Sequence, residues 1–340
     1  MESCLITGGA GFIGSHLAQK LLEEGFNVYS IDNLSTGNIS NIDSLRESYP
    51  KKFTHVTATI EKEESLVAEL IDRSDIIFHL AAAVGVKLVV DEPTKTLETN
   101  TLGTEIILKH ASKKGKRVIL ASTSEVYGKN GFKGPLKESY DSVIGPTNKS
   151  RWGYAVSKLY DEHLALAYFK EKSLPVTIVR FFNITGPKQV GRYGMVLPRF
   201  IQSALTNSKL EVYGDGKQKR CFCYVEDAIE ALIKIIHLKE SIGEIYNIGN
   251  PEEISIAELA EKVKKSVGSS SEIVYIPYSI AYGEGFEDMD RRVPDITKIN
   301  NLMGWSSKTP LDAIIKSTTE WLKESLNLTK LSTPKIIGSR

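Results

Sequence analysis

The amino-acid sequence predicts an α/β fold, a doubly wound parallel sheet with a smaller C-terminal α/β lobe. Over residues 1–183, short apolar stretches alternate with segments of helical periodicity, as in parallel sheets covered by helices. The turn after the first apolar stretch is rich in glycine, and beyond residue 183 the alternation gives way to charged loops. We therefore expect residues 1–183 to form the sheet domain, to which some later segments return, and residues 184–325 to form mainly the lobe.

The elements of the sheet domain follow from the spacing of apolar residues. Runs rich in Val, Ile and Leu predict buried strands, whereas apolar residues three and four apart predict helices. Gly25 ends the first helix, because glycine readily adopts the backbone conformation of a helix C-terminus. The expected strands are 3–7, 27–32, 53–60, 75–82, 117–122 and 176–181. The expected helices are 16–24, 64–71, 93–112 and 152–171.

The chain beyond residue 183 is read in the same way. Its expected helices are 196–206, 226–238, 255–266 and 310–325, and its expected strands lie near 210–213 and 245–248. Residues 326–340 show little periodicity, so we expect a mobile tail there.

Composition and charge exclude several classes of protein. The chain has 340 residues, of which 41% are hydrophobic and 25% charged, and its formal net charge is +1, as in many globular enzymes. The charges are interspersed, which argues against a nucleic-acid or anionic membrane surface. No apolar run approaches the roughly 18 residues that span a bilayer. With no signal-peptide core at the N-terminus, we expect a cytoplasmic protein without nucleic-acid or membrane partners.

The three cysteines form no disulfide framework. Cys221 and Cys223 are expected to alternate along one short strand. Because no cluster of His and Cys completes a ligand set around them, we predict no metal site.

The turn after the first strand is a candidate phosphate-binding loop. Gly8-Gly-Ala-Gly-Phe-Ile-Gly14 fits the dinucleotide fingerprint in two registers, beginning at Gly8 or at Gly9. Its glycines allow a tight turn and close approach of the backbone to a pyrophosphate, which the amides at the helix start then face. Residues expected to contact the cofactor here are Gly8, Gly11, Phe12, Ile13, Gly14, Asp32 and Asn33.

Asp32 indicates which dinucleotide is bound. It ends the second strand 18 residues beyond Gly14, close to the roughly 20 expected for a carboxylate on the adenosine ribose. A carboxylate there repels a 2′-phosphate, which favours NAD over NADP. Together, strand, glycine turn, helix and acid predict a Rossmann-type NAD site rather than a simple tight turn.

Tyr154 and Lys158 are the candidate proton-transfer pair. Four residues apart on an expected helix, they lie one turn from each other on one face. An ammonium near a phenol favours the phenolate, so we expect Lys158 to lower the pKa of Tyr154 from about 10 toward neutrality. The alternative is a surface Tyr and Lys that happen to share this common spacing.

A polar stretch follows the strand that ends at Ser122. Thr123, Ser124 and Glu125 would then lie at the carboxyl edge of the sheet, where doubly wound folds bind ligands. Simple strand termination and a solvated loop acid are the alternatives. All three are candidate catalytic residues, with Thr123 and Glu125 favoured over Ser124.

Several motifs together resemble the extended short-chain dehydrogenase/reductase family of NAD-dependent nucleotide-sugar epimerases, dehydratases and decarboxylases. They are the glycine turn, Leu80-Ala-Ala, Ser122-Thr-Ser-Glu-Val-Tyr-Gly128, Tyr154-Ala-Val-Ser-Lys158 and Arg180-Phe-Phe-Asn183. The resemblance extends over roughly residues 3–325 and implies a homodimer formed through the Tyr154 helix and a neighbour. It also implies cofactor contacts from Leu80, Ala81, Ala82, Asn100, Tyr154 and Lys158.

Narrower matches point to enzymes of UDP-sugars. The segments 145–152, 216–222, 243–251 and 282–292 resemble the UDP-glucuronate decarboxylase domain of the bacterial aminoarabinose pathway. They also resemble UDP-glucuronate 4-epimerases and UDP-hexose 4-epimerases. One departure is Thr59-Ile60, which stands where the family usually has Asp-Ile beside the adenine.

The resemblance implies roles for the remaining candidates. Tyr154, as a phenolate, takes the proton of the sugar 4-hydroxyl while hydride passes from C4 to NAD, Thr123 orients that hydroxyl, and Lys158 holds the nicotinamide ribose. Arg220 and Asn183 are similar to diphosphate ligands, and Arg292 to an arginine near C5 and C6. The expected substrate-binding residues are Asn183, Leu197, Tyr213, Arg220, Arg292 and Arg151, with Leu197 and Tyr213 near the uracil.

The resulting 4-keto sugar is a branch point. Turning it over gives 4-epimerisation, loss of carbon dioxide from a uronic acid gives decarboxylation, and abstraction at C5 gives 4,6-dehydration. We interpret the chain as an NAD-dependent UDP-sugar 4-epimerase that prefers a UDP-hexuronic acid, with a UDP-glucuronate decarboxylase or a 4,6-dehydratase as alternatives. An NAD-sensing module without turnover is disfavoured because Tyr154, Lys158 and Thr123 are all present.

Overall fold

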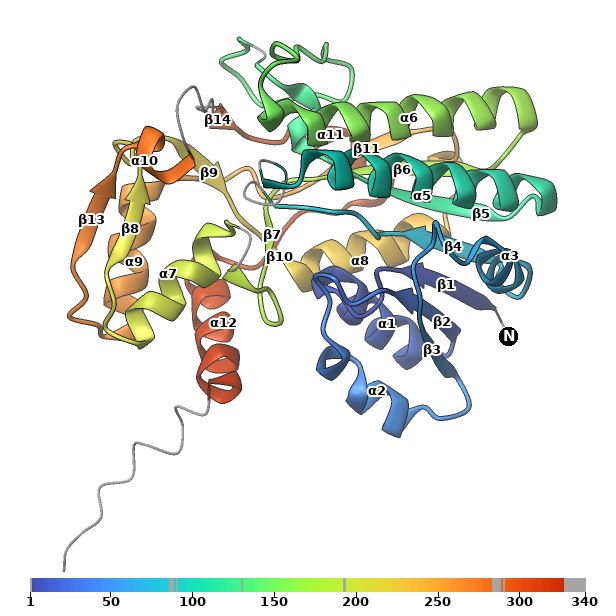
Figure 1. The fold of residues 1–340 in the computed structure, drawn as a ribbon, viewed down its shortest axis with the longest axis horizontal. Helices are drawn as coiled ribbons and strands as arrows, with labels where there is room; N and C mark the ends of the chain where they lie inside the picture. The colour runs from blue at the N-terminus through green and yellow to red at the C-terminus, as the bar shows by residue number, and fades with distance from the viewer. Residues whose placement is uncertain are drawn as a thin grey trace, which may run out of the picture.

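A computed structural model describes residues 2–85, 89, 91–129, 131–191, 194–282, 289 and 291–326 (Figure 1). Most of the predicted tail over 326–340 therefore lies outside the described residues, as does most of the segment 282–292.

The sheet contains seven parallel strands in the order β11-β6-β5-β4-β1-β2-β3. Their bounds are β1 Ser3–Thr7, β2 Asn27–Asp32, β3 Phe53–Thr57, β4 Ile76–His79, β5 Arg117–Thr123, β6 Val176–Phe181 and β11 Ile245–Ile248. Chain order reverses between β1 and β4, which lie side by side with Thr7 opposite His79. This confirms the predicted doubly wound sheet and locates its switch point, where such folds bind ligands.

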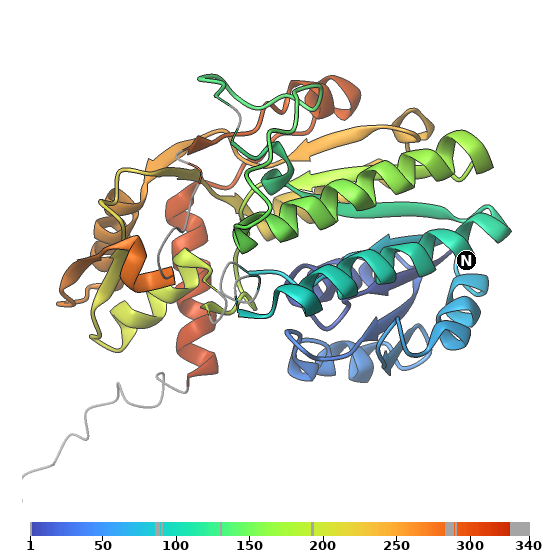
Figure 2. The ribbon, with the colours of Figure 1, turned by 45° about the horizontal axis from the view of Figure 1, so that its top comes forward.

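Helices cover both faces of the sheet (Figures 1 and 2). One face carries α1 Phe12–Glu23, α2 Asp43–Ser48, α8 Val225–Ile236 and α11 Thr297–Met303. The other carries α3 Glu64–Asp72, α5 Pro93–Lys114 and α6 Gly153–Lys172. Successive residues of β1 point to opposite faces of the sheet. Cys4 and Ile6 pack into the core under α1 and α8, whereas Leu5 packs into the core under α3 and α5.

Three elements from the second half of the chain return to the sheet domain. Strand β11 pairs in parallel with β6, α8 packs beside α1, and α11 packs on β11. The apolar pattern of α8 suits this position, because most of its residues are buried in the core between α1, α8 and the sheet. Sequence periodicity gives the type of such an element but not the layer that it joins.

The lobe has a separate core beneath α7, α9 and α12. Its helices are α7 Val196–Leu205, α9 Ile256–Val267, α10 Tyr278–Tyr282 and α12 Leu311–Ser325. Its strands are β8 Leu210–Tyr213, β9 Lys219–Cys221, β12 Glu253–Ser255, β13 Ile273–Ile276 and β14 Arg291–Arg292. Ser255 and Glu258 form a capping box at the start of α9, which satisfies backbone N–H groups left free by the first turn.

The single strand expected around Cys221 and Cys223 is two strands. Cys221 ends β9 in the lobe, whereas Cys223 begins β10 (Cys223–Tyr224), which pairs with β7 (Ile184–Thr185). Phe222, between them, is buried in the lobe core, and this anchor breaks the alternation. All three cysteines are buried and unbonded to one another.

The described residues offer neither a membrane-spanning helix nor a metal-binding cluster. No described helix is both long and apolar enough to cross a membrane. No group of three or more His, Cys, Asp or Glu side chains in that part of the chain is placed to hold a metal ion.

Candidate functional site

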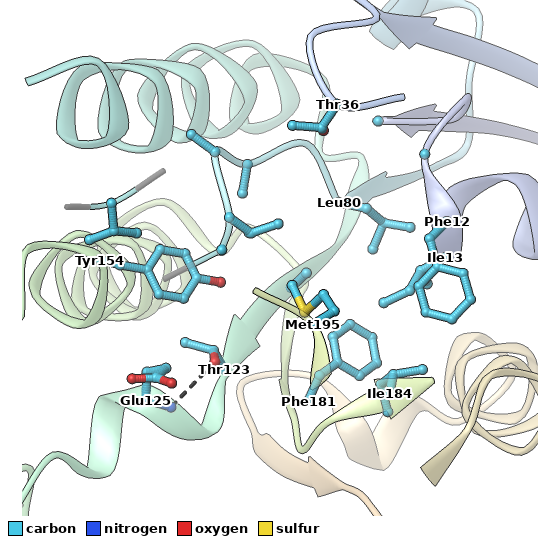
Figure 3. A pocket seen from close by; sticks show the side chains of 18 of the residues that line it. Phe12, Ile13, Thr36, Leu80, Thr123, Glu125, Tyr154, Phe181, Ile184 and Met195 are labelled. Carbon is cyan, nitrogen blue, oxygen red and sulfur yellow. Dashed lines mark hydrogen bonds between the residues drawn. The ribbon is translucent and has the colours of Figure 1, made fainter. Parts of the chain in front are cut away.

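A cavity of about 580 Å³ lies at the carboxyl edge of the sheet, lined by both the sheet domain and the lobe (Figure 3). Every predicted site residue lines it except Asn100. One part, which we call the glycine-turn end, is formed by the Gly8–Gly14 turn, Asp32 and Leu80–Ala82. The opposite part, the arginine end, is formed by Thr123–Glu125, Tyr154 and the three predicted arginines, Arg151, Arg220 and Arg292.

The glycine turn is closed so tightly that side chains are excluded from it. Gly8 has φ +74° and donates its N–H to the carbonyl of Ile31 at 2.8 Å. A Cβ on Gly14 would lie 2.1 Å from the carbonyl oxygen of Gly8. Gly8 lines the cavity, whereas Gly9 packs against Ser30, which favours the register that begins at Gly8. The start of α1, just after this turn, faces the cavity with unpaired amides.

Asp32 is held rigidly in the cavity wall. Its Oδ2 accepts the N–H of Ala10 at 3.1 Å, and its Oδ1 accepts the N–H of Leu34 at 2.8 Å. Each carboxylate oxygen keeps a further lone pair for a ligand hydroxyl. A glycine turn that admits no Cβ, a helix start and a fixed carboxylate therefore suit a dinucleotide with a free 2′-hydroxyl.

Asn100 does not line the cavity, so its expected contact with the cofactor stays a prediction. Its Oδ1 accepts the N–H of Ala83 at 2.7 Å, and its Nδ2 donates to the Ser157 hydroxyl at 3.1 Å. Asn100 thus ties the turn after β4 to the α6 helix beside Lys158. Because it is buried with these bonds made, its role is to position the cavity wall.

At Thr59-Ile60, where the family usually has Asp-Ile, the cavity wall is formed by the apolar Ile60 and the neighbouring acid Glu61. Ile60 and Glu61 both line the cavity, whereas the Thr59 carbonyl accepts the N–H groups of Lys62 and Glu63, each at 3.1 Å. Glu61 was not predicted, because the usual acid is expected two residues earlier.

Tyr154 projects into the cavity near Thr123 and Glu125 (Figure 3). Burial and then the negative charge of Glu125 raise the pKa of Tyr154 well above its ordinary value, and the Thr123 hydroxyl partly opposes this. The expectation that Lys158 lowers this pKa in the protein alone is therefore wrong. The Nζ of Lys158 is paired with Asp161 at 3.0 Å, and Asp161 itself raises the pKa of Tyr154.

Glu125 lies between two arginines. It forms ion pairs with Arg292 and, at 2.6 Å, with Arg151, and all three side chains are buried. Burial alone would raise the pKa of Glu125, but the charges of Arg292, Arg151 and Arg220 lower it to about 2. Glu125 is therefore a carboxylate at neutral pH, and it cannot donate a proton there.

Strand pairing brings the two distant arginines together. On the parallel strands β9 and β14, Arg220 is the register partner of Arg292, although 72 residues separate them. The Nη1 of Arg292 also lies 3.5 Å from the Ser124 hydroxyl, at the limit for a hydrogen bond. Its buried Nε has no hydrogen-bond partner among the described residues, so one N–H donor remains for a ligand.

The remaining substrate candidates lie toward the lobe. Asn183, with φ +42°, donates its Nδ2 to the Cys221 carbonyl at 2.9 Å and thereby holds β9. Leu197 lies buried in the first turn of α7. The ring of Tyr213 stacks under the Arg199 guanidinium, 4.1 Å from its centre. Arg199 also lines the cavity and was not predicted, because a lone arginine in a helix has no distinctive pattern.

Comparisons with known proteins agree with this geometry. Residues 5–318 match the family described as GDP-mannose 4,6 dehydratase. The chain is 43% identical over 327 residues to a UDP-N-acetyl-alpha-D-glucosaminuronate decarboxylase of Bacillus cytotoxicus, covering 96% of this chain and 99% of that protein. It is 36% identical over 322 residues to UDP-glucuronic acid decarboxylase 1 of Xenopus tropicalis, covering 95% and 72%.

Among solved structures, the fold is similar to that of UDP-glucuronic acid 4-epimerase from Bacillus cereus, in complex with UDP-glucuronic acid and NAD. The two chains are 28% identical, and the TM-score is 0.85 over 95% of this chain and 99% of that one.

Proposed function

Because this chain belongs to the GDP-mannose 4,6 dehydratase family of extended short-chain dehydrogenases/reductases, we propose that it is an NAD-dependent decarboxylase of a UDP-linked uronic acid. The observation that carries the proposal is the similarity, over 95% or more of this chain, to decarboxylases of two such substrates. The 4-epimerase interpretation of the sequence thereby becomes the second candidate.

NAD is the cofactor, as in neighbours of this fold that are solved with NAD bound. When bound, NAD accepts hydride from C4 of the sugar and later returns it, so the cycle consumes no oxidant. The glycine turn would hold the pyrophosphate against the start of α1, and Asp32 would accept the adenosine ribose hydroxyls. Lys158 would donate to the nicotinamide ribose.

Tyr154 is the proposed base and acid at C4. As a phenolate it would accept the 4-hydroxyl proton, and it would return that proton when the ketone is reduced. The Thr123 hydroxyl, at the end of β5 beside it, is placed to orient the sugar oxygen. Since burial and Glu125 disfavour the phenolate in the protein alone, positive charge at the loaded site has to supply the missing stabilisation.

Arg292 is the proposed ligand of the uronate carboxylate. Its buried Nε retains an unused donor in the described structure, and a guanidinium matches a carboxylate well. A 4-keto uronic acid is a β-keto acid, whose C5–C6 bond electrons can pass to the carbonyl as carbon dioxide leaves. Glu125, already bonded to Arg292 and Arg151, would repel a substrate carboxylate brought close to it.

One observation favours the second candidate, a UDP-glucuronate 4-epimerase. The Bacillus cereus epimerase covers the chain end to end with the same fold. Both enzymes need Tyr154, Lys158 and a cation for the carboxylate, so the choice depends on sugar orientation, in which shifts of about 1 Å decide the outcome.

We also propose a homodimer through α5 and α6. On these neighbouring helices, five large apolar side chains are exposed to solvent, an unusual amount for free helix faces. They are Leu97, Leu102, Val156, Tyr160 and Phe169. A dimeric mass by light scattering, lost in Val156→Asp, would support this interface, whereas a monomeric wild-type protein would refute it.

The deciding experiment is product analysis by NMR after incubation with NAD and each of three substrates. They are UDP-N-acetylglucosaminuronate, UDP-glucuronate and UDP-glucose. Release of carbon dioxide with a UDP-pentose product from either uronate supports decarboxylation. Recovery of the 4-epimer with C6 retained would replace the proposal by the second candidate, and a 4-keto-6-deoxy product from UDP-glucose would indicate dehydration.

A further inference from the structure

Lys158 is tied to an acid that the proposed reaction does not use. Asp161, three residues further along α6, is completely buried, and its Oδ2 lies 3.0 Å from the Lys158 Nζ. Its Oδ1 accepts no hydrogen bond from any described residue. The Thr104 hydroxyl, beside this carboxylate on α5, donates to the Asn100 carbonyl at 3.0 Å. Burial raises the pKa of Asp161, and Lys158 first and then the Thr104 hydroxyl oppose this effect. Among the described residues, Lys158 is thus the charged partner of this buried carboxylate.

Such a pair contributes little to folding. Desolvating two charges costs several kcal/mol, which their attraction roughly offsets, and apolar replacements of similar volume are often as stable. Asp161 therefore matters more for what it does to Lys158. Helical side chains lean toward the N-terminus, which for Lys158 is the direction of Tyr154. Asp161 follows Lys158 on the C-terminal side, and its carboxylate holds the ammonium at 3.0 Å.

We propose that Asp161 is a positioning residue that acts through Lys158, fixing the ammonium by one donor and offsetting its positive charge near Tyr154. An ammonium has three N–H donors, so two remain for the nicotinamide ribose. The inference rests on the proposed function only in assigning Tyr154 and Lys158 to the reacting end of the cavity. Asp161 itself does not line the cavity.

Other charged groups also act on this pair and on Tyr154, and a test has to separate them. They are Glu125 and Arg151 near Tyr154, His79 near Lys158, and Glu162 near Asp161. Glu162 is paired with Arg180. Helix α5 faces the pair with the neutral Asn100 and Thr104. His79 is buried between Thr7 and Thr104, and burial followed by the charge of Lys158 lowers its pKa to about 3, so it stays neutral.

The first test uses Asp161→Asn, which keeps an acceptor oxygen for Lys158 but removes the negative charge. We expect ionisation of Tyr154 in the NAD-saturated protein to move down by about one pH unit, because a nearby charge changes a pKa by about that much. The readout is phenolate absorbance, taken as the difference between each protein and its Tyr154→Phe counterpart. Asp72→Asn is the control, since it removes the same charge from a surface ion pair with Lys114.

The second test uses Asp161→Leu, which has no acceptor for Lys158. Isothermal titration should show about tenfold weaker NAD binding, whereas Asp161→Asn should stay within about threefold of wild type. Should Asp161→Leu fail to fold, the smaller Asp161→Ala, which also has no side-chain acceptor, takes its place with the same expectation.

Two results would overturn the proposal. One is an unmoved Tyr154 titration in folded Asp161→Asn, or an equal shift in Asp72→Asn. The other is wild-type NAD affinity in the variant without an acceptor. Neither readout needs a sugar, so a failure to decarboxylate any substrate would refute the proposed function and leave this inference standing.

Discussion

The two ends of the cavity are built in different ways. The glycine-turn end is made mostly of main chain, from the Gly8–Gly14 turn, the end of β2 and the turn after β4. The arginine end is made of side chains from η2 (Ser124–Tyr127), η3 (Ser150–Trp152), α6, β9 and β14. The first end is the proposed site of the cofactor, and the second is the proposed site of the sugar.

This difference has a physical basis. Backbone amides and a helix start can bind a pyrophosphate without help from a particular side chain, so a short local motif suffices. Binding and turning a sugar requires charges at defined distances, and these come from strands that meet only after folding. We therefore expect changes at the arginine end to alter chemistry and specificity, and changes at the glycine-turn end to alter cofactor binding or stability.

The largest effect is expected for Tyr154→Phe. Removing the phenol should lower kcat by a factor of about 10² to 10⁴ while NAD binding and the melting temperature stay close to wild type. Steady-state kinetics with the preferred uronate measures kcat, and isothermal titration measures the affinity for NAD. A kcat near that of wild type would contradict the assignment of Tyr154.

The next largest effect is expected for Arg292→Ala. It removes the proposed carboxylate ligand and one partner of Glu125, so kcat/KM for a UDP-uronate should fall about 100-fold, far more than for UDP-glucose. Arg291→Ala is the matched control, because Arg291 pairs with Glu253 at 2.7 Å in the adjacent position outside the cavity. Equal losses with both substrates would assign Arg292 to the diphosphate or to folding.

The two ends should also titrate in different pH windows. His79, at the glycine-turn end, has a pKa of about 3 when folded against 6.5 as its ordinary value. The unfolded chain therefore binds a proton that the folded chain does not, and stability falls with pH between 6.5 and 3. At pH 5 the loss from this residue is about 2 kcal/mol.

The pKa of Glu125 is also lowered, to about 2 against 4.5 as its ordinary value, so its window lies at lower pH than that of His79. Its stabilisation is complete above the ordinary value and is lost only as the pH falls from there toward 2. Urea unfolding at pH 7 and pH 5 should therefore show a drop in wild type that is about 2 kcal/mol smaller in His79→Gln. An equal drop in both would show that His79 is not the group that titrates.

The smallest effect is expected at Asp32. Wild type should bind NAD about tenfold more tightly than NADP, and Asp32→Ser should remove most of this preference, because the carboxylate no longer repels a 2′-phosphate. Asp43→Ser, an exposed acid at the start of α2, is the control. Tighter binding of NADP than of NAD by the wild-type chain would contradict this role for Asp32.

The sequence predicts an element well where its local apolar pattern is clear, and less well where the structure depends on contacts with distant residues. The strands β2 and β6 were predicted residue for residue, because their apolar runs are buried on both faces. The prediction of one strand through Cys221 and Cys223 was wrong, because Phe222 is buried in the lobe core by contacts with residues distant in sequence. The resemblance assigned Asn100 to the cofactor, and only the structure shows that it bonds to Ala83 and Ser157 behind the cavity wall.

By itself, the sequence determined the order of strands and helices, the glycine turn and the residues able to transfer a proton, because each depends on neighbours a few positions away. The tertiary structure alone decided that Arg220 and Arg292 meet across two strands, that Glu125 is held ionised between arginines, and that Lys158 is paired with Asp161. These outcomes depend on burial and on distances between charges, and a linear sequence specifies neither until the chain has folded.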